Sequence, residues 1–269
     1  MTFEYKNKTA LVTGASSGIG EAFCRELAKR GMHLIIAARS EDLLHKLAGE
    51  LSEAHNIRVD VFAVDLSDED GIYNTIDACV EMARPIDLLI NNAGFGNVGA
   101  YEKQDQTRER DMVMVNSFAV AQLCHAFIPP MAERGFGGVI NVASIAGYQP
   151  LPHLATYAAT KAFVKSLSNS LWAEFKGRGV HIMELSPGPV ATNFVNATDS
   201  KAMNSKTTAG FMKVAMTPEK LVQKALGSFD AGKPRCIPGQ ANQLMTAMCN
   251  LVPDSLIGNV VALGMKKLK

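Results

Sequence analysis

The residues most suited to chemistry in this chain are Tyr157 and Lys161, four positions apart, with Ser144 thirteen residues before the tyrosine. The spacing of apolar residues over 154–176 predicts a helix, on which residues i and i+4 share one side. The lysine falls on the apolar side, where an unpaired ammonium is costly, so it needs a specific partner or a helix rotated outward. A cationic amine beside a phenol lowers the phenol's pKa and makes it a proton donor or acceptor near neutrality. A tyrosine and a lysine four apart also occur as an ordinary snorkelling surface pair, and the rest of the chain has to decide between these alternatives.

A glycine-rich stretch near the start of the chain, TGASSGIG at 13–20, is typical of a turn that binds phosphate. It follows an apolar run at 9–13 and leads into a segment whose apolar residues recur at helical spacing. In that context Gly14 permits a tight turn, Gly18 lets a ligand approach the backbone, and Gly20 allows the helix to pack on its strand. The N–H groups and dipole at the helix start then suit a pyrophosphate. An ordinary loop is the alternative, but the flanking strand and helix favour a dinucleotide site.

The end of the second apolar strand pattern, 32–38, indicates which dinucleotide is bound. An acidic residue there would bind the 2′-hydroxyl of NAD. The chain instead reads Ala37, Ala38, Arg39, so the acid is absent and a guanidinium can pair with a 2′-phosphate. NADP is therefore the predicted cofactor. The alternative left open is that Arg39 is a solvated residue at the start of the next helix.

Polar residues follow further strand patterns at their carboxyl ends, where open parallel sheets bind ligands. Asp65 ends the third pattern, NNAG at 91–94 ends the fourth, and Ser144 ends the fifth. Asp65 is equally suited to cap the helix after it. Asn116 interrupts an apolar helical pattern at 111–131, and a buried amide needs partners; a structural hydrogen bond to a neighbouring strand would also account for it.

Six strand patterns alternate with helical ones and a seventh follows. This order predicts a Rossmann-like, doubly wound parallel sheet with helices on both faces, in a single domain, 1–269. The length and the 47% hydrophobic content suffice for one large core. The predicted strands are 9–13, 32–38, 59–64, 86–90, 137–143, 180–185 and 235–238.

The C-terminal third is less regular. Residues 193–216 lose strong periodicity and include several methionines, which suits a substrate lid. The tail, 254–269, has an apolar face typical of a helix that packs on its own protein or on a dimer partner. Because Lys266, Lys267 and Lys269 follow that face, contact with an anionic membrane surface is the alternative.

Composition disfavours several classes of function. The net charge is +1 with both signs mixed and no basic run before the C-terminal lysines, which disfavours nucleic-acid binding. The five cysteines are widely spaced without a CxxC, so we expect reduced thiols, no zinc or other metal site, and a cytoplasmic protein. We expect no signal peptide, and no apolar run near the roughly 20 residues of a membrane-spanning helix.

Taken in order, these motifs make the chain resemble the short-chain dehydrogenase/reductase family in its single-domain form. The resemblance covers about 8–192 and is carried by TGASSGIG, Asp65, NNAG, Asn116, Ser144, YAATK and PGPVAT. It implies that Tyr157 is the general acid/base, with Lys161 lowering its pKa and binding the nicotinamide ribose hydroxyls. Ser144 would hydrogen-bond the substrate oxygen, and Asn116 would hold a water in a proton relay from Lys161 to solvent.

The resemblance also implies a set of cofactor contacts. They are Gly14, Ala15, Ser16, Ser17, Gly18, Ile19 and Gly20 at the pyrophosphate, Asp65 and Leu66 at the adenine, Asn92 beside the ribose and nicotinamide, and Val190 and Thr192 at the carboxamide. Asn91 is expected to be structural. NADP-preferring members often carry a basic residue just before the second glycine, and this chain has Ser17 there. The NADP prediction therefore depends on Arg39 and the missing acid.

The predicted function is that of an NADP-dependent oxidoreductase that transfers a hydride between NADPH and a carbonyl or secondary alcohol. Residues around 145–154 and 193–216 favour an apolar substrate, whose identity is left open because many reductases share these catalytic parts. A non-catalytic NADP-sensing protein and a membrane-peripheral lipid or acyl-chain ketone reductase are the alternatives. The resemblance implies a homodimer or homotetramer.

Overall fold

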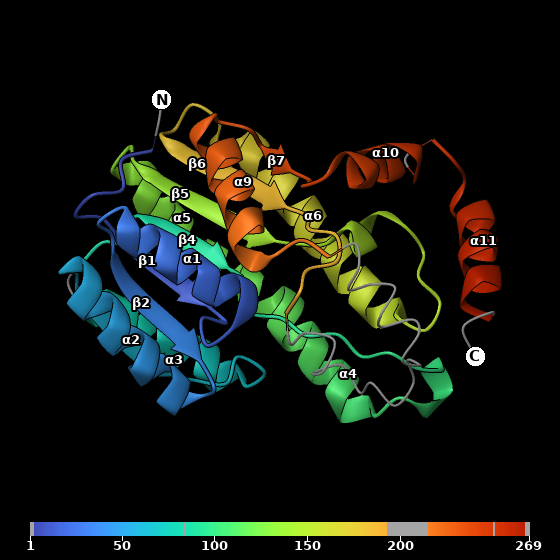
Figure 1. Cartoon of the computed structure of the whole chain (residues 1–269), viewed down its shortest axis with the longest axis horizontal. Helices are drawn as coiled ribbons and strands as arrows, with labels where there is room; N and C mark the ends of the chain where they lie inside the picture. Colours follow the sequence, from blue (N-terminus) through green and yellow to red (C-terminus); the bar gives the residue numbers. More distant parts are fainter. Residues whose placement is uncertain (1–2, 83, 193–214, 250, 267–269) are drawn as a thin grey trace.

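A computed structural model of the chain describes residues 3–82, 84–192, 215–249 and 251–266. In these residues seven strands form one sheet in the order β3-β2-β1-β4-β5-β6-β7, and all neighbouring strands are parallel (Figure 1). The predicted doubly wound parallel sheet is confirmed. The strands are β1 (Thr9–Thr13), β2 (His33–Ala38), β3 (Val59–Ala63), β4 (Leu88–Asn91), β5 (Gly137–Val142), β6 (Val180–Leu185) and β7 (Arg235–Cys236).

Helices cover both faces of the sheet. The α-helices described are α1 (Gly18–Lys29), α2 (Glu41–His55), α3 (Glu69–Glu81), α4 (Gln106–Val113), α5 (Ala119–Glu133), α6 (Ala155–Phe175), α9 (Pro218–Asp230), α10 (Gln240–Cys249) and α11 (Asp254–Lys266). Short helical turns are η1 (Tyr101–Lys103), η2 (Met114–Phe118), which is a π-helix, and η3 (Ile145–Tyr148).

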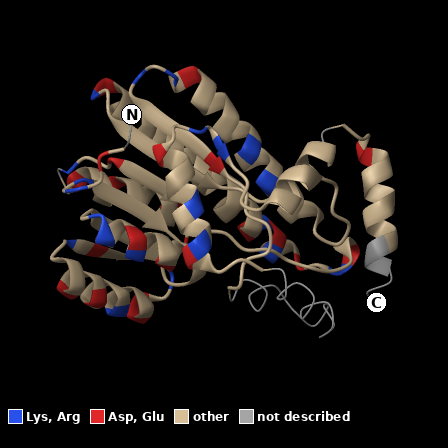
Figure 2. Cartoon of the chain, turned by 45° about the horizontal axis from the view of Figure 1, so that its top comes forward, with Lys and Arg blue, Asp and Glu red and all other residues tan. Residues whose placement is uncertain are grey.

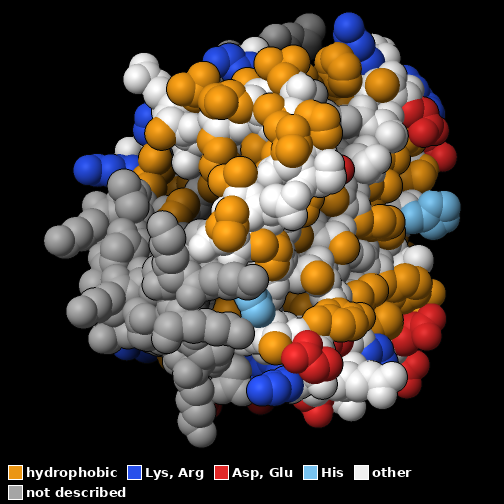
Figure 3. Space-filling view, turned by 90° about the vertical axis from the view of Figure 1, so that its right-hand side faces the viewer, with side chains coloured by type: hydrophobic (Ala, Val, Ile, Leu, Met, Phe, Trp, Pro, Cys, Tyr) orange, Lys and Arg blue, Asp and Glu red, His pale blue; other side chains and the backbone are white. Residues whose placement is uncertain are grey.

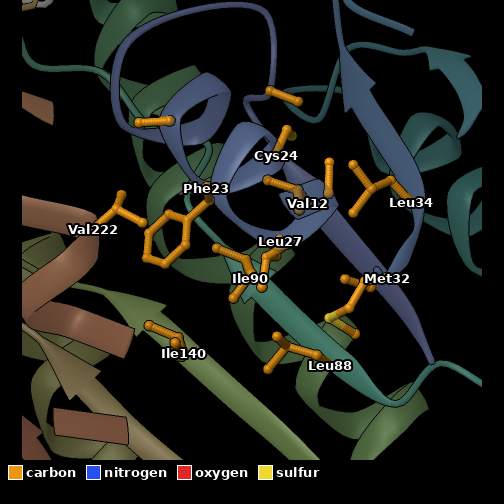
Figure 4. Packing of buried hydrophobic residues seen from close by; sticks show 14 of the residues in the cluster. Val12, Phe23, Cys24, Leu27, Met32, Leu34, Leu88, Ile90, Ile140 and Val222 are labelled. Carbon is orange, nitrogen blue, oxygen red and sulfur yellow. The ribbon is translucent and has the colours of Figure 1, made fainter. Parts of the chain in front are cut away.

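The core lies in two layers because successive strand residues point to opposite faces. Val12 packs with residues of α1, α2 and α9, whereas its neighbour Leu11 packs with residues of α3, α5 and α6. Figure 4 shows Phe23 and Leu27 of α1 against Ile90 of β4 in the first layer. Burial on both faces explains why the central strands read as continuous apolar runs rather than as alternating ones.

Two helical predictions need correction. The helix expected over 111–131 begins earlier, at Gln106, and is interrupted by the π-turn η2 around Asn116. Helix α10 was not predicted, because its sequence mixes Gln, Asn, Thr and Met without a clear apolar period. The expected lid, 193–216, lies outside the described residues except for its last two, of which Met216 forms a bridge to Val190.

The helical run Gln106–Glu133 is long and apolar enough, by length and composition, to cross a membrane, although the sequence patterns predict no such run. Of its most apolar window, 56% is buried inside the protein. Leu123 and Phe127 are at most 5% exposed and belong to the core layer with β5. We therefore attribute the apolarity of this run to core packing.

Charged residues are distributed unevenly over the described chain. Figure 2 shows both signs mixed over the helices of the sheet domain, whereas α10 and α11 are almost uncharged. Between residues 240 and 265 the sequence has one charged residue, Asp254. These two helices lie at the end of the molecule away from α2 and α3 (Figure 1).

Candidate active site

The glycine turn joins β1 to α1 and is too close-packed for larger residues. Gly14 and Gly18 have φ values of +65° and +59°, which favour glycine. A Cβ at Gly14 would lie 2.9 Å from the Cα of Ala93, and a Cβ at Gly20 would collide with the carbonyl oxygen of Gly14. Helix α1 begins at Gly18, after Ser17, whose side chain forms no cap hydrogen bond. The first N–H groups of a helix lack intrahelical partners, so this turn fits a pyrophosphate.

The other residues of the turn have distinct environments. Ala15 is buried, and its N–H donates to the carbonyl of Ala37 at 3.3 Å. Ile19 packs against the core layer of α1, Ser16 is partly exposed and Ser17 is exposed. The serines are therefore the members of the turn whose side chains solvent, or a ligand, can reach.

Asn92 holds this turn in place. Its Nδ2 donates to the carbonyls of Thr13 at 2.9 Å and Gly14 at 3.2 Å, and its backbone N–H donates to Thr13 Oγ1 at 3.0 Å. The amide nitrogen is thus used within the protein. Asn91 lies on the other side of β4, where its Nδ2 donates to Asn141 Oδ1 at 2.8 Å in the core.

Arg39 and Asp65 meet at the edge of the sheet where β2 and β3 end. Arg39 Nη1 lies 3.8 Å from Asp65 Oδ2, and the arginine side chain is 75% exposed. Asp65 Oδ1 also accepts from the N–H and hydroxyl of Ser67, at 2.9 and 2.8 Å. The N-cap of α3 is Asp68, so Asp65 closes the preceding turn rather than capping the helix. A solvent-screened pair of this length leaves the guanidinium able to turn toward a 2′-phosphate.

The remaining cofactor candidates follow β3 and β6, at the same edge of the sheet. The Leu66 side chain is 5% exposed and packs in a small apolar cluster with Ile72, so an adenine contact would fall to its backbone. Thr192 lies against the glycine turn, because a Cβ built on Gly18 would be 3.0 Å from Thr192 Cγ2. The N–H of Thr192 donates to the carbonyl of Val190 at 2.9 Å.

Asn116 lies in the π-turn η2 and is fully buried. Its Oδ1 accepts from the N–H of Phe95 at 3.1 Å, and its Nδ2 donates to the Phe95 carbonyl at 2.9 Å and to Thr160 Oγ1 at 3.1 Å. The side chain therefore fastens the loop after β4 to α6. Both hydrogens of the amide are used, whereas Oδ1 has accepted one hydrogen bond and can accept another.

Ser144, Tyr157 and Lys161 converge at the carboxyl end of β5. The hydroxyl of Tyr157 lies close enough to Ser144 for the serine to lower the phenol's pKa, and Ser144 Oγ accepts from the N–H of Ala146 at 3.1 Å. Lys161 is 5% exposed, and its Nζ donates to the carbonyl of Val142 at 2.9 Å. The ammonium lies 5.8 Å from the centroid of the Tyr157 ring. The buried lysine thus has the specific partner that its position on the apolar side requires.

Burial controls the acidity of this pair. It raises the pKa of Tyr157 to about 12, although the hydrogen bond with Ser144 acts in the opposite direction. It lowers the pKa of Lys161 to about 8. The rise in the pKa of Tyr157 is due to desolvation of the phenolate, and the expectation that Lys161 lowers the phenol's pKa stays a prediction.

Two residues of the site were missed. A Cβ on Gly94 would lie 2.9 Å from Asn116 Oδ1 and 3.3 Å from Lys161 Nζ, so the absence of a side chain at this glycine leaves room for both groups. Thr160 Oγ1 donates to the carbonyl of Tyr157 at 2.8 Å while accepting from Asn116. Both belong to motifs singled out in the sequence, NNAG and YAATK, but only their place in the fold gives them these roles.

The described residues contain no group of three or more His, Cys, Asp or Glu side chains that could hold a metal ion. The fold and the site together define a dinucleotide-binding α/β protein with a serine, a tyrosine and a lysine at the carboxyl end of the sheet. The chain belongs to the short chain dehydrogenase family, whose model matches residues 8–203.

Relatives with this fold include reductases and dehydrogenases. The very-long-chain 3-oxoacyl-CoA reductase of Anas platyrhynchos is 32% identical, over 97% of this chain and 80% of that protein. The structure of a short-chain dehydrogenase from Sphingobium yanoikuyae in complex with NADPH is 30% identical, covers 91% of this chain and 94% of that one, and has a TM-score of 0.79. A bulky-bulky ketone specific alcohol dehydrogenase from Comamonas testosteroni is 31% identical, with 91% and 93% covered and a TM-score of 0.76.

Proposed function

We propose that this chain is an NADP-dependent oxidoreductase that interconverts an apolar ketone and its secondary alcohol, with Tyr157 as the general acid/base. The observation that carries the proposal is the convergence of Tyr157 and Ser144, which interact beside buried Lys161 at the carboxyl end of β5. Family membership supports the class of reaction, oxidation of CH–OH or reduction of C=O.

The cofactor is NADP. The glycine turn and the adjacent Thr192 would hold the pyrophosphate and nicotinamide, and Arg39 would hold the 2′-phosphate. A relative of known structure binds NADPH. When bound, NADPH supplies the hydride and the oxidised form accepts one.

In the reducing direction, the two hydroxyls of Ser144 and Tyr157 would both bind the substrate's carbonyl oxygen. With its pKa near 12, Tyr157 is protonated at neutral pH and can donate its proton as negative charge develops on that oxygen. Lys161 would replace the lost proton, since the pKa of its ammonium is near 8. Asn116, whose Oδ1 lies beside Gly94 as Lys161 Nζ does, would hold the water that returns a proton from solvent.

The substrate class is proposed from the relatives and from the apolar residues around Ser144. The named relatives act on a very-long-chain 3-oxoacyl-CoA and on ketones with two bulky substituents. A panel of such ketones and 3-oxoacyl thioesters, with sugars and short ketones for comparison, would test this by following NADPH absorbance. Turnover confined to sugars would contradict an apolar substrate.

The decisive variant is Tyr157→Phe, which removes the phenolic proton but keeps the ring. We expect turnover to fall by roughly 10²–10⁴-fold while NADPH affinity, measured by fluorescence titration, changes little. Tyr73→Phe, at a 41% exposed tyrosine of α3, is the matched control and should retain activity.

Undiminished turnover in Tyr157→Phe would contradict the proposed role of this tyrosine. Tight NADPH binding by the unaltered protein, with no carbonyl of the panel reduced, would instead support a non-catalytic NADP-sensing protein.

A further inference from the structure

Exposed apolar side chains are concentrated at one end of this molecule. Among the described residues, seven of the thirteen exposed large hydrophobic side chains lie between residues 244 and 263, on α10, α11 and the turn joining them. Figure 3 views the molecule from that end and shows hydrophobic side chains gathered on its surface. Scattered exposed leucines are ordinary, but a cluster of this kind marks an interaction surface.

The two helices present these side chains at regular spacing. On α11, Leu256, Val260 and Leu263 lie at i, i+4 and i+7 and are 57%, 69% and 63% exposed. The neighbouring Ile257 and Val261 are only partly exposed. Helix α11 therefore has an apolar side toward the protein and a second, unpartnered apolar side toward solvent.

Helix α10 continues the pattern. Leu244 and Met248 are 65% and 55% exposed at i and i+4, and Leu251 follows three residues later at 85%. We call the six exposed residues of both stripes the C-terminal apolar surface. They are Leu244, Met248, Leu251, Leu256, Val260 and Leu263.

The charge around this surface indicates what could cover it. Asp254 is the one charged residue between 240 and 265, and the chain then ends with Lys266, Lys267 and Lys269. Apolar stripes followed by a basic cluster are the composition of helices that lie in the interface of anionic membranes. For a two-fold dimer the sequence offers one acidic residue, Asp254, per copy against three lysines, which electrostatics disfavours.

The surface adjoins the candidate active site. Asn242 of α10 lies against Gly188 in the loop after β6, because a Cβ on that glycine would be 2.9 Å from Asn242 Cγ. Cys249 Sγ lies 3.8 Å from Oε1 of Gln149, just after the turn that follows Ser144. Whatever covers the C-terminal apolar surface therefore lies on the same side of the molecule as the loops around the substrate site.

We propose that the C-terminal apolar surface docks the protein onto an anionic phospholipid bilayer, with α10 and α11 lying in the interface. The docking depends on the exposed stripes and the terminal lysines and does not require the proposed oxidoreductase activity. If that activity holds, docking brings the site next to substrates dissolved in the lipid.

The test is co-sedimentation of the full chain with vesicles of phosphatidylglycerol and phosphatidylcholine, compared with phosphatidylcholine alone. We expect binding to the anionic vesicles that weakens as salt is raised. Replacing Leu256, Val260 and Leu263 together by serine should weaken binding by about tenfold or more, because it removes the apolar stripe of α11. The matched control is the triple serine variant of Leu43, Tyr73 and Val80, which are exposed on α2 and α3, away from this surface, and should bind as the original does.

A second variant avoids any effect of serine on helix stability. Replacing Lys266, Lys267 and Lys269 by glutamine should reduce binding to anionic vesicles while leaving the circular dichroism spectrum and NADPH binding unchanged. Absence of vesicle binding by the unaltered protein, or equal binding by the stripe and control variants, would overturn the proposal. Concentration-dependent dimers that dissociate in the stripe variant, without vesicle binding, would overturn it in favour of a second copy of this chain.

Discussion

Lys161 is a buried ammonium whose one described hydrogen bond is to a backbone carbonyl, that of Val142. A charge in such surroundings is disfavoured relative to water, and this is why the pKa of Lys161 falls to about 8. The same burial raises the pKa of Tyr157. The two shifts bring the lysine and tyrosine closer to their neutral forms, so the pair is prepared for proton transfer rather than for a stable ion pair.

These shifts make stability depend on pH in a definable window. A lysine whose pKa is lowered on folding destabilises the native state while it is charged, and this effect is relieved as pH rises from about 8 toward 10.5. In Lys161→Met the effect is absent. We therefore expect the original protein to gain up to about 2 kcal/mol of unfolding free energy relative to Lys161→Met between pH 7 and pH 9.5, measured by urea denaturation.

The comparison has a matched control in Lys46→Met. Lys46 is exposed on α2, so this change should leave the difference from the original protein constant over the same range. Ionisation of tyrosines above pH 10 affects both variants alike, which is why the measurement stops at pH 9.5. Parallel stability curves for Lys161→Met and the original protein would contradict the buried-charge interpretation.

Strand β6 carries a buried carboxylate that joins the elements around Ser144. Glu184 is fully buried, and its Oε1 accepts from the hydroxyls of Tyr148 and Ser186, both at 2.6 Å. Its Oε2 accepts from Asn169 Nδ2 at 3.1 Å and from Arg235 Nε at 3.0 Å. One side chain therefore connects the turn η3, strand β7, helix α6 and the loop after β6.

Replacing this carboxylate should weaken all of those connections at once. In Glu184→Gln one carboxylate oxygen becomes an NH₂ group, which would face hydrogen-bond donors of the surrounding residues. The change also removes the negative charge that pairs with Arg235. Breaking a buried charged network on one side is costly, so we expect a loss of about 3 kcal/mol in unfolding free energy by urea denaturation. Glu50→Gln, in a solvent-screened pair with Arg25, should cost far less, and equal effects would show that the Glu184 network contributes little.

The elements also show where sequence reasoning succeeds and where it fails. Strands β1 and β6 have the predicted bounds, because the edges of a fully buried parallel strand coincide with the edges of an apolar run. The π-turn at Asn116 was not predicted, because it depends on hydrogen bonds to Phe95 and Thr160, which are distant in sequence. The role of Glu184 could not be predicted from the sequence. A single acidic residue in a strand is expected to face solvent, and only the fold shows the four donors around this one.

In the whole molecule, the candidate site is assembled where parallel strands end along one edge of a single sheet. Residues after each of the strands β1 to β6 contribute to it, so their order in the sequence and the parallel topology suffice to bring them together. This is why the location of the site could be predicted from motifs. The acidity of Tyr157 could not be predicted, because it is set by how completely the surrounding segments exclude water.

A site that joins so many strands should couple cofactor binding to the stability of the whole chain. A ligand that binds only the native state stabilises it by about 2.7 kcal/mol at one hundred times its Kd, which corresponds to a rise in Tm of roughly 5–10 °C for a chain of this size.

We expect NADPH to raise the Tm more than NADH at equal concentration, because Arg39 can pair with the 2′-phosphate. Arg39→Ala should reduce the shift with NADPH and leave the shift with NADH unchanged, as measured by differential scanning fluorimetry. Arg58→Ala, at the opposite end of β3, is the matched control and should keep both shifts, and a loss of both shifts in Arg39→Ala would show that this arginine supports the fold rather than selecting the cofactor.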